Sequence, residues 1–198
     1  HVAPKFGTGM GGFIGTSGTA LEISTTDDPD FNFNTSDPFT IEGWFSLTDA
    51  SGGGNAIGSK HLNDGNNWSV GFDGSNVVWR TRVSSGSYSN ICSGAHGMSN
   101  DTWYHVAFVR TTATDYKIYV DGIQKAAGTT SYSFTHADSS KLKIGINDND
   151  FDSSQGTTYF KGYMDDYRVS RTARYTSGFT PSTTAFKDDK DTVALLHM

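Results

Sequence analysis

The segment Phe39-Thr-Ile-Glu-Gly-Trp-Phe45 decides the fold, because its residues alternate regularly between two chemical kinds. Successive side chains of a β-strand point to opposite faces of a sheet. One face would carry Phe39, Ile41, Gly43 and Phe45, and the other Thr40, Glu42, Trp44 and Ser46. The first set is expected to face a hydrophobic core, so the segment predicts a strand of a layered β-structure.

The same two-residue period recurs along the chain, in short runs separated by clusters of Gly, Asn, Asp and Ser. Strands are expected at 19–24, 38–47, 55–60, 67–73, 76–83, 87–93, 103–111, 116–121, 123–127, 141–146, 159–170 and 192–197. About twelve short strands without intervening helices predict an all-β, antiparallel β-sandwich. No linker divides the chain, so residues 1–198 are expected to form a single domain.

Two dipeptides, Asp73-Gly74 and Asp121-Gly122, stand between alternating segments. Both central residues of a tight hairpin turn need positive φ, which Asp and Gly tolerate. The dipeptides therefore predict that 67–73 pairs with 76–83, and that 116–120 pairs with 123–127.

Composition excludes several classes of protein. The 198 residues carry a net charge of -6 and no basic cluster, so a nucleic-acid partner is not expected. No apolar run approaches the ~20 residues needed to cross a bilayer, so no membrane insertion is expected. The single Cys92 cannot form an internal disulfide and is expected to be a packing residue. Among the 21 acidic residues only Glu22 and Glu42 are glutamates, and aspartate favours turns over helices.

Five segments together resemble the laminin-G-like, concanavalin A-like jelly-roll modules, which are related to the pentraxins. The segments are Phe39–Phe45, Trp103–Arg110, Lys117–Gly122, Leu142–Gly145 and Lys161–Ser170. They stand in the order found in that family and span most of the chain. The resemblance implies the jelly-roll sandwich, but this fold hosts lectins, glycan-binding modules and glycosidases alike.

Three further segments resemble modules of phage virion proteins, especially tail fibres. They are the closing segments Arg171–Pro181 and Asp191–His197 and the opening segment Pro4–Gly9. The chain also begins at His1 rather than Met. We therefore expect a module of a longer or processed protein at a virion surface or outside the cell, assembled as an oligomer or with neighbouring modules.

Catalysis by this fold is not expected here. Retaining glycoside hydrolysis needs two carboxyl groups about 5 Å apart. Glu22 and Glu42 lie on separate expected strands, and Asp165 and Asp166 are adjacent in a strand and so would point to opposite faces. The predicted function is accordingly binding rather than cleavage.

A calcium site is the sharpest candidate. Asp148, Asp150 and Asp152 alternate with Asn147 and Asn149, and calcium takes six to eight oxygen ligands. An EF-hand is excluded, because a loop that starts at Asp148 has Ser153 where an EF-hand needs Gly and Tyr159 where it needs Glu. The resemblance to pentraxins implies a calcium loop after the strand at 142–146, with further ligands near Asn55. The alternative is a solvated acidic loop whose side chains only satisfy turn geometry.

Asp165 is a second candidate metal ligand. Its carboxylate is expected to share an inward face with Tyr163, Tyr167 and Val169, where it needs a cation, an Arg or backbone N–H groups. Hydrogen bonds from backbone groups would remove the need for a metal.

Glycan binding needs aromatic faces flanked by polar side chains. If the strands alternate in direction, the loops at 48–54, 74–75, 94–102 and 147–157 share one end of the sandwich. The predicted ligand-binding residues are Trp68, Asn76, Trp79, His96 and Phe151. Packing of Trp68 and Trp79 on the sheet is the alternative, whereas Trp44 and Trp103 are expected to be structural.

The sequence therefore predicts a lectin-like module that binds glycan or polysaccharide, with calcium as cofactor. Two alternatives stay open. The domain could be a purely structural or decorating virion component, or the carbohydrate-binding appendage of a polysaccharide-degrading enzyme.

Overall fold

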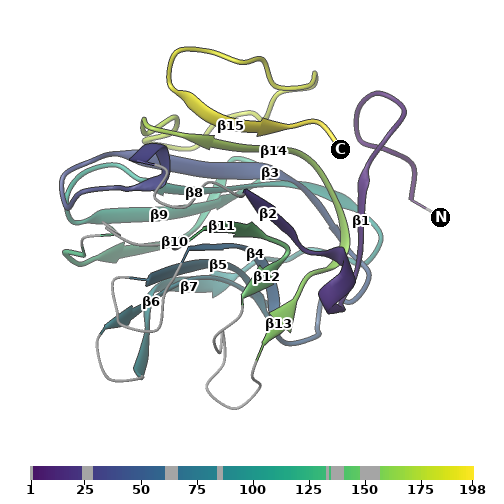
Figure 1. Ribbon diagram of the computed structural model, residues 1–198, viewed down its shortest axis with the longest axis horizontal. Coiled ribbons are helices and arrows are strands. Elements are labelled where there is room, and N and C mark those ends of the chain that lie inside the picture. Colours follow the sequence, from purple (N-terminus) through teal and green to yellow (C-terminus); the bar gives the residue numbers. More distant parts are fainter. Residues whose placement is uncertain are drawn as a thin grey trace.

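The computed structural model describes residues 2–23, 29–60, 67–83, 87–132, 134, 141–147 and 157–198. They form two antiparallel sheets that face each other, together with one short hairpin (Figure 1). This arrangement confirms the predicted all-β sandwich. Two 3-10 turns, η1 (Ser17–Thr19) and η2 (Pro29–Phe31), are the helical elements of the described residues.

Sheet A has seven strands, and its order is β1-β14-β3-β8-β9-β10, with β15 beside β14. The strands are β1 (Gly11–Ile14), β14 (Lys161–Ser170), β3 (Phe39–Leu47), β8 (Trp103–Arg110), β9 (Asp115–Val120), β10 (Ile123–Thr129) and β15 (Thr192–Leu196). Both β1 and β15 pair with β14, β1 along its first half and β15 along its second. The first and last strands of the chain are therefore edge strands of the same sheet.

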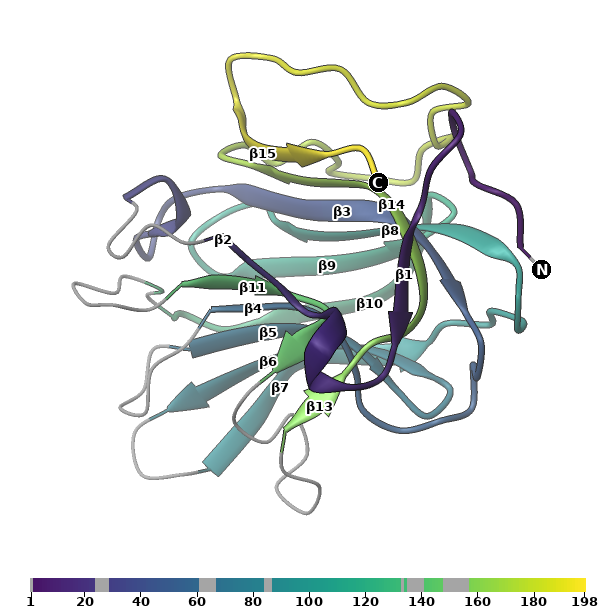
Figure 2. The same ribbon diagram turned by 45° about the vertical axis from the view of Figure 1, so that its right-hand side comes forward.

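Sheet B has six strands in the order β2-β11-β4-β5-β6-β7. The strands are β2 (Leu21–Ile23), β11 (Leu142–Ile144), β4 (Asn55–Lys60), β5 (Asn67–Asp73), β6 (Asn76–Val83) and β7 (Ser87–Ala95). The chain passes from sheet A to sheet B through η1, which links β1 to β2 (Figure 2). A separate pair, β12 (Ile146–Asn147) and β13 (Thr158–Tyr159), lies against β4.

The main core lies between the two sheets. Phe39, Ile41 and Phe45 of β3 are buried in it, as their alternation predicts. Cys92 also belongs to this core, and burial raises the pKa of its thiol to about 12. At neutral pH the thiol is thus protonated and acts as a packing residue.

The outer face of sheet A is covered as well. Every residue of β3 is buried, because the segment 171–191 folds back over the face opposite the core. Tyr175 and Phe179 of this covering segment pack on Tyr119, with Ala107 and Val109 in the same small cluster. Sheet A is consequently the middle layer of the molecule over much of its area.

Glu42 is buried beneath this covering segment, with no exposed side-chain surface. Its carboxylate accepts hydrogen bonds from Arg168 Nε (2.9 Å) and Nη2 (2.6 Å), from the Tyr175 hydroxyl (2.8 Å), and from His105 Nε2 (3.1 Å). Arg174 Nε lies 3.6 Å away. The carboxylate therefore joins strands β3, β8 and β14 to the covering segment.

Both predicted hairpins are present, and one has a different turn. Val120 pairs with Ile123, which leaves Asp121 and Gly122 as the two loop residues, with φ of 48° and 74°. In the β5–β6 hairpin Asp73 pairs with Asn76, so the loop residues are Gly74 and Ser75 rather than Asp73 and Gly74. The pairing is confirmed, and the turn lies one residue further along.

A β-bulge interrupts β14. Asp165 pairs with Trp44 and Arg168 with Glu42, so the residues between them do not keep register with β3. Asp166 has φ of 51°, a conformation that only a few per cent of non-glycine residues adopt. The bulge reverses the alternation, so Tyr167 enters the core while Asp165 opposes Trp44 on the outer face. The predicted inward face for Asp165 is wrong for this reason.

Replacing Glu42 with Gln should lower the free energy of unfolding by about 3 kcal/mol, because it leaves Arg168 buried without its negative partner. Urea denaturation at neutral pH measures this loss. The matched control is Glu22→Gln, since Glu22 is half exposed and pairs with Lys141 at the surface. That change should cost less than about 1 kcal/mol. Equal costs for the two variants would contradict the structural role assigned to Glu42.

The contribution of Glu42 should also depend on pH. Burial alone would raise its pKa, but the hydrogen bond and charge interaction with His105, and then the charge of Arg168, hold the pKa below its ordinary 4.5. A carboxyl group with a lowered folded-state pKa stabilises fully above its unfolded-state pKa, and less as pH falls through the folded-state value. The stability gap between the native chain and Glu42→Gln should therefore shrink on acidification below 4.5. Urea titrations across that range test this, and a constant gap would be inconsistent with it.

Candidate functional site

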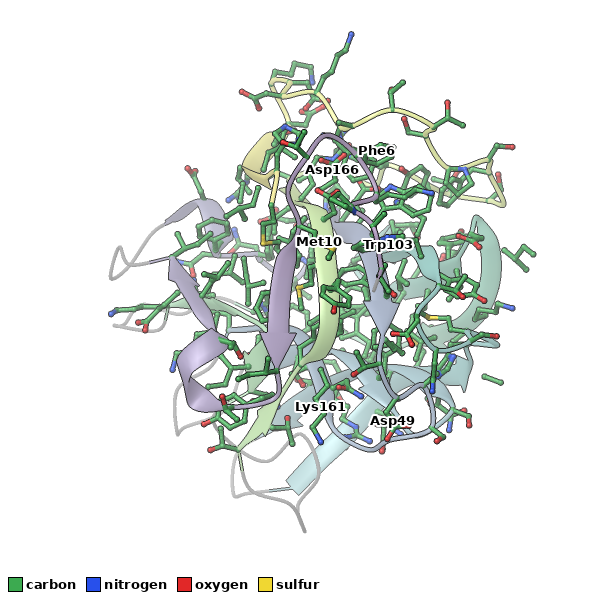
Figure 3. The ribbon with its side chains drawn as sticks, turned by 90° about the vertical axis from the view of Figure 1, so that its right-hand side faces the viewer. Phe6, Met10, Asp49, Trp103, Lys161 and Asp166 are labelled. Atoms are coloured by element: carbon green, nitrogen blue, oxygen red, sulfur yellow. The ribbon has the colours of Figure 1, made fainter. Side chains whose placement is uncertain are left out.

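Three of the four predicted rim loops, 48–54, 74–75 and 94–102, meet at one end of the sandwich, and most of the fourth, 147–157, lies outside the described residues. We call residues 47–55, 74–76, 94–102 and 157–161, which include the strand ends beside these loops, the loop rim. The Asp101 N–H donates to Leu47 O (2.8 Å), and the His96 N–H to Ser75 O (3.0 Å). The Lys161 N–H donates to Asn55 Oδ1 (2.9 Å), which links the last segment to the first. Figure 3 faces this end, with Asp49 and Lys161 lying close together.

Two rim residues, Asn55 predicted as a metal ligand and His96 predicted to bind a glycan, make contacts within the protein. Asn55 is buried, and its amide oxygen accepts the Lys161 N–H. His96 is also buried, its Nδ1 accepting the Met98 N–H (2.9 Å) and its Nε2 lying 3.2 Å from Gly74 O. Burial and these contacts correct the prediction that His96 binds a ligand, whereas Asn55 as a calcium ligand stays a prediction. Asn76 is exposed at the start of β6, where it stays available to a ligand.

The predicted calcium loop falls mostly outside the described residues. Asp148, Asp150, Phe151 and Asp152 are all among the residues not described. Asn147 ends β12 and is buried. Within the described ranges no three His, Cys, Asp or Glu side chains gather in a way that could hold a metal ion. Calcium binding accordingly stays a prediction.

Trp68 and Trp79 are wrong as sugar-binding platforms. Both rings are buried in the core between the sheets, and Trp79 makes edge-to-face contacts with Phe39, Phe108 and Tyr116. The register of β5 and β6 turns both indoles inward rather than toward solvent. A ring packed in this way cannot stack on a sugar, so the packing alternative is the one that the structure supports.

Asp165 and Asp166 lie side by side, contrary to the expectation that they point to opposite faces. The positive φ of Asp166 breaks the alternation, and both residues line one hollow of about 670 Å³ together with His197. Asp165 accepts N–H bonds from Phe6 (3.0 Å) and Asp166 (2.8 Å). Asp166 accepts the Phe186 N–H (2.6 Å), and its other oxygen lies 2.5 Å from His197 Nδ1.

These carboxylates fasten the two ends of the chain to β14. Asp165 is held by backbone N–H groups, which was the alternative to a metal ligand. Burial raises the pKa of Asp165, the Phe6 N–H opposes that rise, and the charge of Asp166 adds to it. The pair is therefore better explained by anchoring of the terminal segments than by chemistry at the hollow.

A second hollow, beside the loop rim, has the composition of a sugar site. We call it the Trp103 pocket; its volume is about 430 Å³, within the ordinary range for small-ligand sites. Its lining is Lys5, Phe6, Trp44, Trp103, Asp121, Pro181, Ser182 and Thr183. It lies on the outer face of sheet A between the N-terminal segment and the covering segment. Figure 3 shows Trp103 at the end of the molecule that carries the rim.

The floor of the pocket is formed by two tryptophans from neighbouring strands. Trp44 is 6% exposed, and its ring is met edge-on by Phe6. Trp103 begins β8 and keeps part of its ring exposed. Its Nε1–H donates to Ala3 O (2.8 Å), which fixes the orientation of the indole.

Polar groups stand around this aromatic floor. Asp121 is exposed in the β9–β10 turn, and its Oδ1 accepts the His105 N–H (2.9 Å). Within the described part of the chain its second oxygen has no hydrogen-bond partner. The ammonium of Lys5 lies 3.7 Å from the centre of the Trp44 ring. Thr183 also lines the pocket and carries a hydroxyl group.

The sequence did not reveal this pocket, although it contains two recognised features. From the sequence, Asp121-Gly122 is predicted only as a hairpin turn, and Trp103 only as a structural residue. One further signal was available: Trp103 directly follows a loop that was expected at the rim. The positions of Lys5 and 181–183 depend on long-range folding and could not be anticipated.

The family model described as "Concanavalin A-like lectin/glucanases superfamily" matches residues 17–177, which is most of the chain. The chain belongs to this superfamily. The assignment confirms the resemblance found in its strands. Because the superfamily contains both lectins and glucanases, membership fixes the fold and leaves the function to the site. No curated protein sequence matches the chain significantly.

Several solved structures share the fold at low identity. One is a Bacteroides ovatus protein described as a candidate carbohydrate-binding protein, with TM-score 0.63, 16% identity, and 95% of this chain covering 50% of that one. Another is a botulinum neurotoxin type C structure from a study of its interaction with two ganglioside molecules (TM-score 0.59, 17% identity, 82% covering 39%). The binding domain of Paraclostridial Mosquitocidal Protein 1 is a third (TM-score 0.57, 13% identity, 81% covering 39%).

The present chain thus spans 39% to 50% of the length of these structures. In the described residues no helix is long and apolar enough to span a membrane.

Exposure of the tryptophans tests the site directly. Trp44, Trp68 and Trp79 are at most 6% exposed, whereas Trp103 keeps part of its ring accessible. Acrylamide should therefore quench a minor part of the native tryptophan fluorescence, and Trp103→Phe should remove most of that quenchable part. The urea-unfolded chain, in which all four rings are accessible, is the reference. Unchanged quenching in the variant would mean that another tryptophan is the accessible one.

Proposed function

We propose that this domain binds glycan without cleaving it, and that the Trp103 pocket is the binding site. The observation that carries the proposal is the meeting of a partly exposed indole, a free carboxylate oxygen and a hydroxyl group around one hollow. Sugars present C–H faces and hydroxyl edges, and this lining matches both. The lectin-like fold supports the same reading.

Each group has a separate part in binding. The indole of Trp103 would stack against the C–H face of a sugar ring, burying apolar surface while its N–H stays bonded to Ala3. The free oxygen of Asp121 would accept a sugar hydroxyl, and a hydrogen bond to a charged group is stronger than one between neutral groups. Because the Asp121-Gly122 turn is held by the His105 N–H, the carboxylate is fixed before the ligand arrives.

Cleavage is not part of the proposal. Glu22 lies in β2 of sheet B and Glu42 in β3 of sheet A, where Glu42 is buried and fully bonded. The two carboxyl groups therefore cannot flank the same glycosidic bond, as hydrolysis would require. The oxygens of Asp165 and Asp166 accept backbone hydrogen bonds that anchor the terminal segments.

The biological setting that we propose is the surface of a phage or virus particle, where the domain would attach to surface polysaccharide. This part rests on the resemblance of 171–181 and 191–197 to virion modules. The sequence flanking residues 1 and 198 would decide the setting. Repeated copies or coiled-coil segments would favour a fibre, and an adjacent catalytic domain would favour a polysaccharide-degrading enzyme.

Replacing Trp103 with Ala, or Asp121 with Asn, should weaken glycan binding at least about tenfold, equivalent to ~1.4 kcal/mol. Asn tolerates the positive φ of position 121 and keeps an oxygen for the His105 N–H, so the turn should survive. Binding is first located on a glycan array and then measured by isothermal titration with the best saccharide. Melting temperatures near that of the native chain establish that both variants are folded.

Asp101→Asn is the matched control, because Asp101 is also exposed with positive φ but lies on the loop rim outside the pocket. It should leave the affinity unchanged. Loss of binding in Asp101→Asn but not in Asp121→Asn would place the site on the rim instead. The titration is repeated with calcium and with a chelator, and an affinity independent of calcium would contradict the prediction that calcium is a cofactor.

A further inference from the structure

We propose that the Trp103 pocket selects a sugar that carries a single anionic group, which is bound by the ammonium of Lys5. The inference rests on the proposed glycan binding and names the class of glycan. The anion could be a carboxylate or a sulfate ester, since a lysine ammonium recognises either as a point charge.

Lys5 is a cation held in place within the pocket. Its ammonium lies 3.7 Å from the centre of the Trp44 ring and 5.8 Å from that of Phe6. Attraction between a cation and an aromatic face is worth about 0.5–1 kcal/mol at exposed sites and more where water is excluded. This contact limits the positions open to an otherwise flexible side chain and keeps the charge at the pocket wall.

The same ammonium has no carboxylate partner in the described ranges of the chain. Other lysines of the described surface do pair, for example Lys141 with Glu22 and Lys190 with Asp191. An ammonium has three donors, and the ring satisfies only part of that capacity. Lys5 is therefore free to bind an anion without first breaking an ion pair.

Asp121 on the pocket lining sets the orientation of the ligand. A second anionic group near its carboxylate would be repelled, whereas a sugar hydroxyl there would be bound. The ligand must then carry its anion toward Lys5 and its neutral hydroxyls toward Asp121. A sugar ring with one acidic substituent meets this requirement, with the indole of Trp103 beneath the ring.

The charge of the whole chain narrows the class further. The net charge is -6, so a densely charged polyanion would be repelled from the surface as a whole. Repulsion falls off over about 10 Å at ordinary ionic strength, and one anion seated at Lys5 feels mainly the local cation. Sparsely charged acidic saccharides are favoured over sulfated polymers and nucleic acids.

The experiment uses pairs of oligosaccharides that differ only in one acidic group, such as an oligogalactose with a single galacturonate unit against the plain oligogalactose, together with a singly sulfated counterpart. Isothermal titration compares the native chain with Lys5→Met and Lys5→Arg. Met keeps the apolar stem over Trp44 without the charge, and Arg keeps both the charge and the ring contact. The native chain should bind the acidic member of a pair at least about tenfold more tightly than the neutral one. Lys5→Met should reduce that ratio to about one, and Lys5→Arg should keep most of it.

The possible results are distinguishable. Loss of the ratio in Lys5→Met, with the affinity for the neutral sugar unchanged, supports the inference, and the sulfated arm then separates sulfate from carboxylate. Equal binding of acidic and neutral sugars by the native chain overturns the inference but leaves the proposed glycan binding intact. If Lys5→Met still prefers the acidic sugar over the neutral one, the inference is likewise overturned and the proposed glycan binding is left intact. Absence of binding to every saccharide on the array overturns both.

Discussion

The buried carboxylate of Glu42 is the constraint on which the rest of the molecule depends. A carboxylate without exposed surface is costly unless charged and hydrogen-bonded partners surround it. Arg168 and His105 reach it from the neighbouring strands, and Tyr175 reaches it from the covering segment. The covering segment therefore completes the solvation of a group in the sheet, and removing the segment would expose an unsatisfied charged cluster as well as apolar surface.

The covering segment is in turn held by its own ion pair. Arg174 is shared between Glu42 and Asp189, with bonds of 2.9 and 2.8 Å to the Asp189 carboxylate. The hydrogen bond from Arg174 holds the pKa of Asp189 well below its usual range. The N-terminal segment is fastened separately, by the Phe6 N–H on Asp165 and by the contact of Lys5 with Trp44. Both ends of the chain thus become walls of the Trp103 pocket through contacts with one sheet.

Local pattern was sufficient to predict the sandwich but not its outer layer. The alternation in β3 correctly placed Phe39, Ile41 and Phe45 in the core, because it depends only on the geometry of a strand. The same alternation misplaced Asp165, since a bulge at Asp166 has no clear signature in the sequence. Trp68 and Trp79 could face either side of sheet B, and the register that turns them inward is fixed by pairing across the sheet. The aspartates of the predicted calcium loop lie outside the described residues, so the prediction of calcium binding rests on their spacing in the sequence alone.

The family match ends where the distinctive part of the pocket begins. Residues 17–177 include Trp44, Trp103 and Asp121, which belong to the strands and a turn of the sandwich. Lys5 and 181–183 lie outside that range and come from the two terminal segments. The common fold therefore supplies an aromatic floor and one carboxylate, while the groups that would select among glycans come from segments that the family model does not describe. A ligand that touches both Lys5 and Asp121 would also hold the N-terminal segment to the sheet, so that binding and attachment of this segment stabilise each other. The choice among glycans then depends on how the two terminal segments are anchored to the sheet, which the fold alone does not determine.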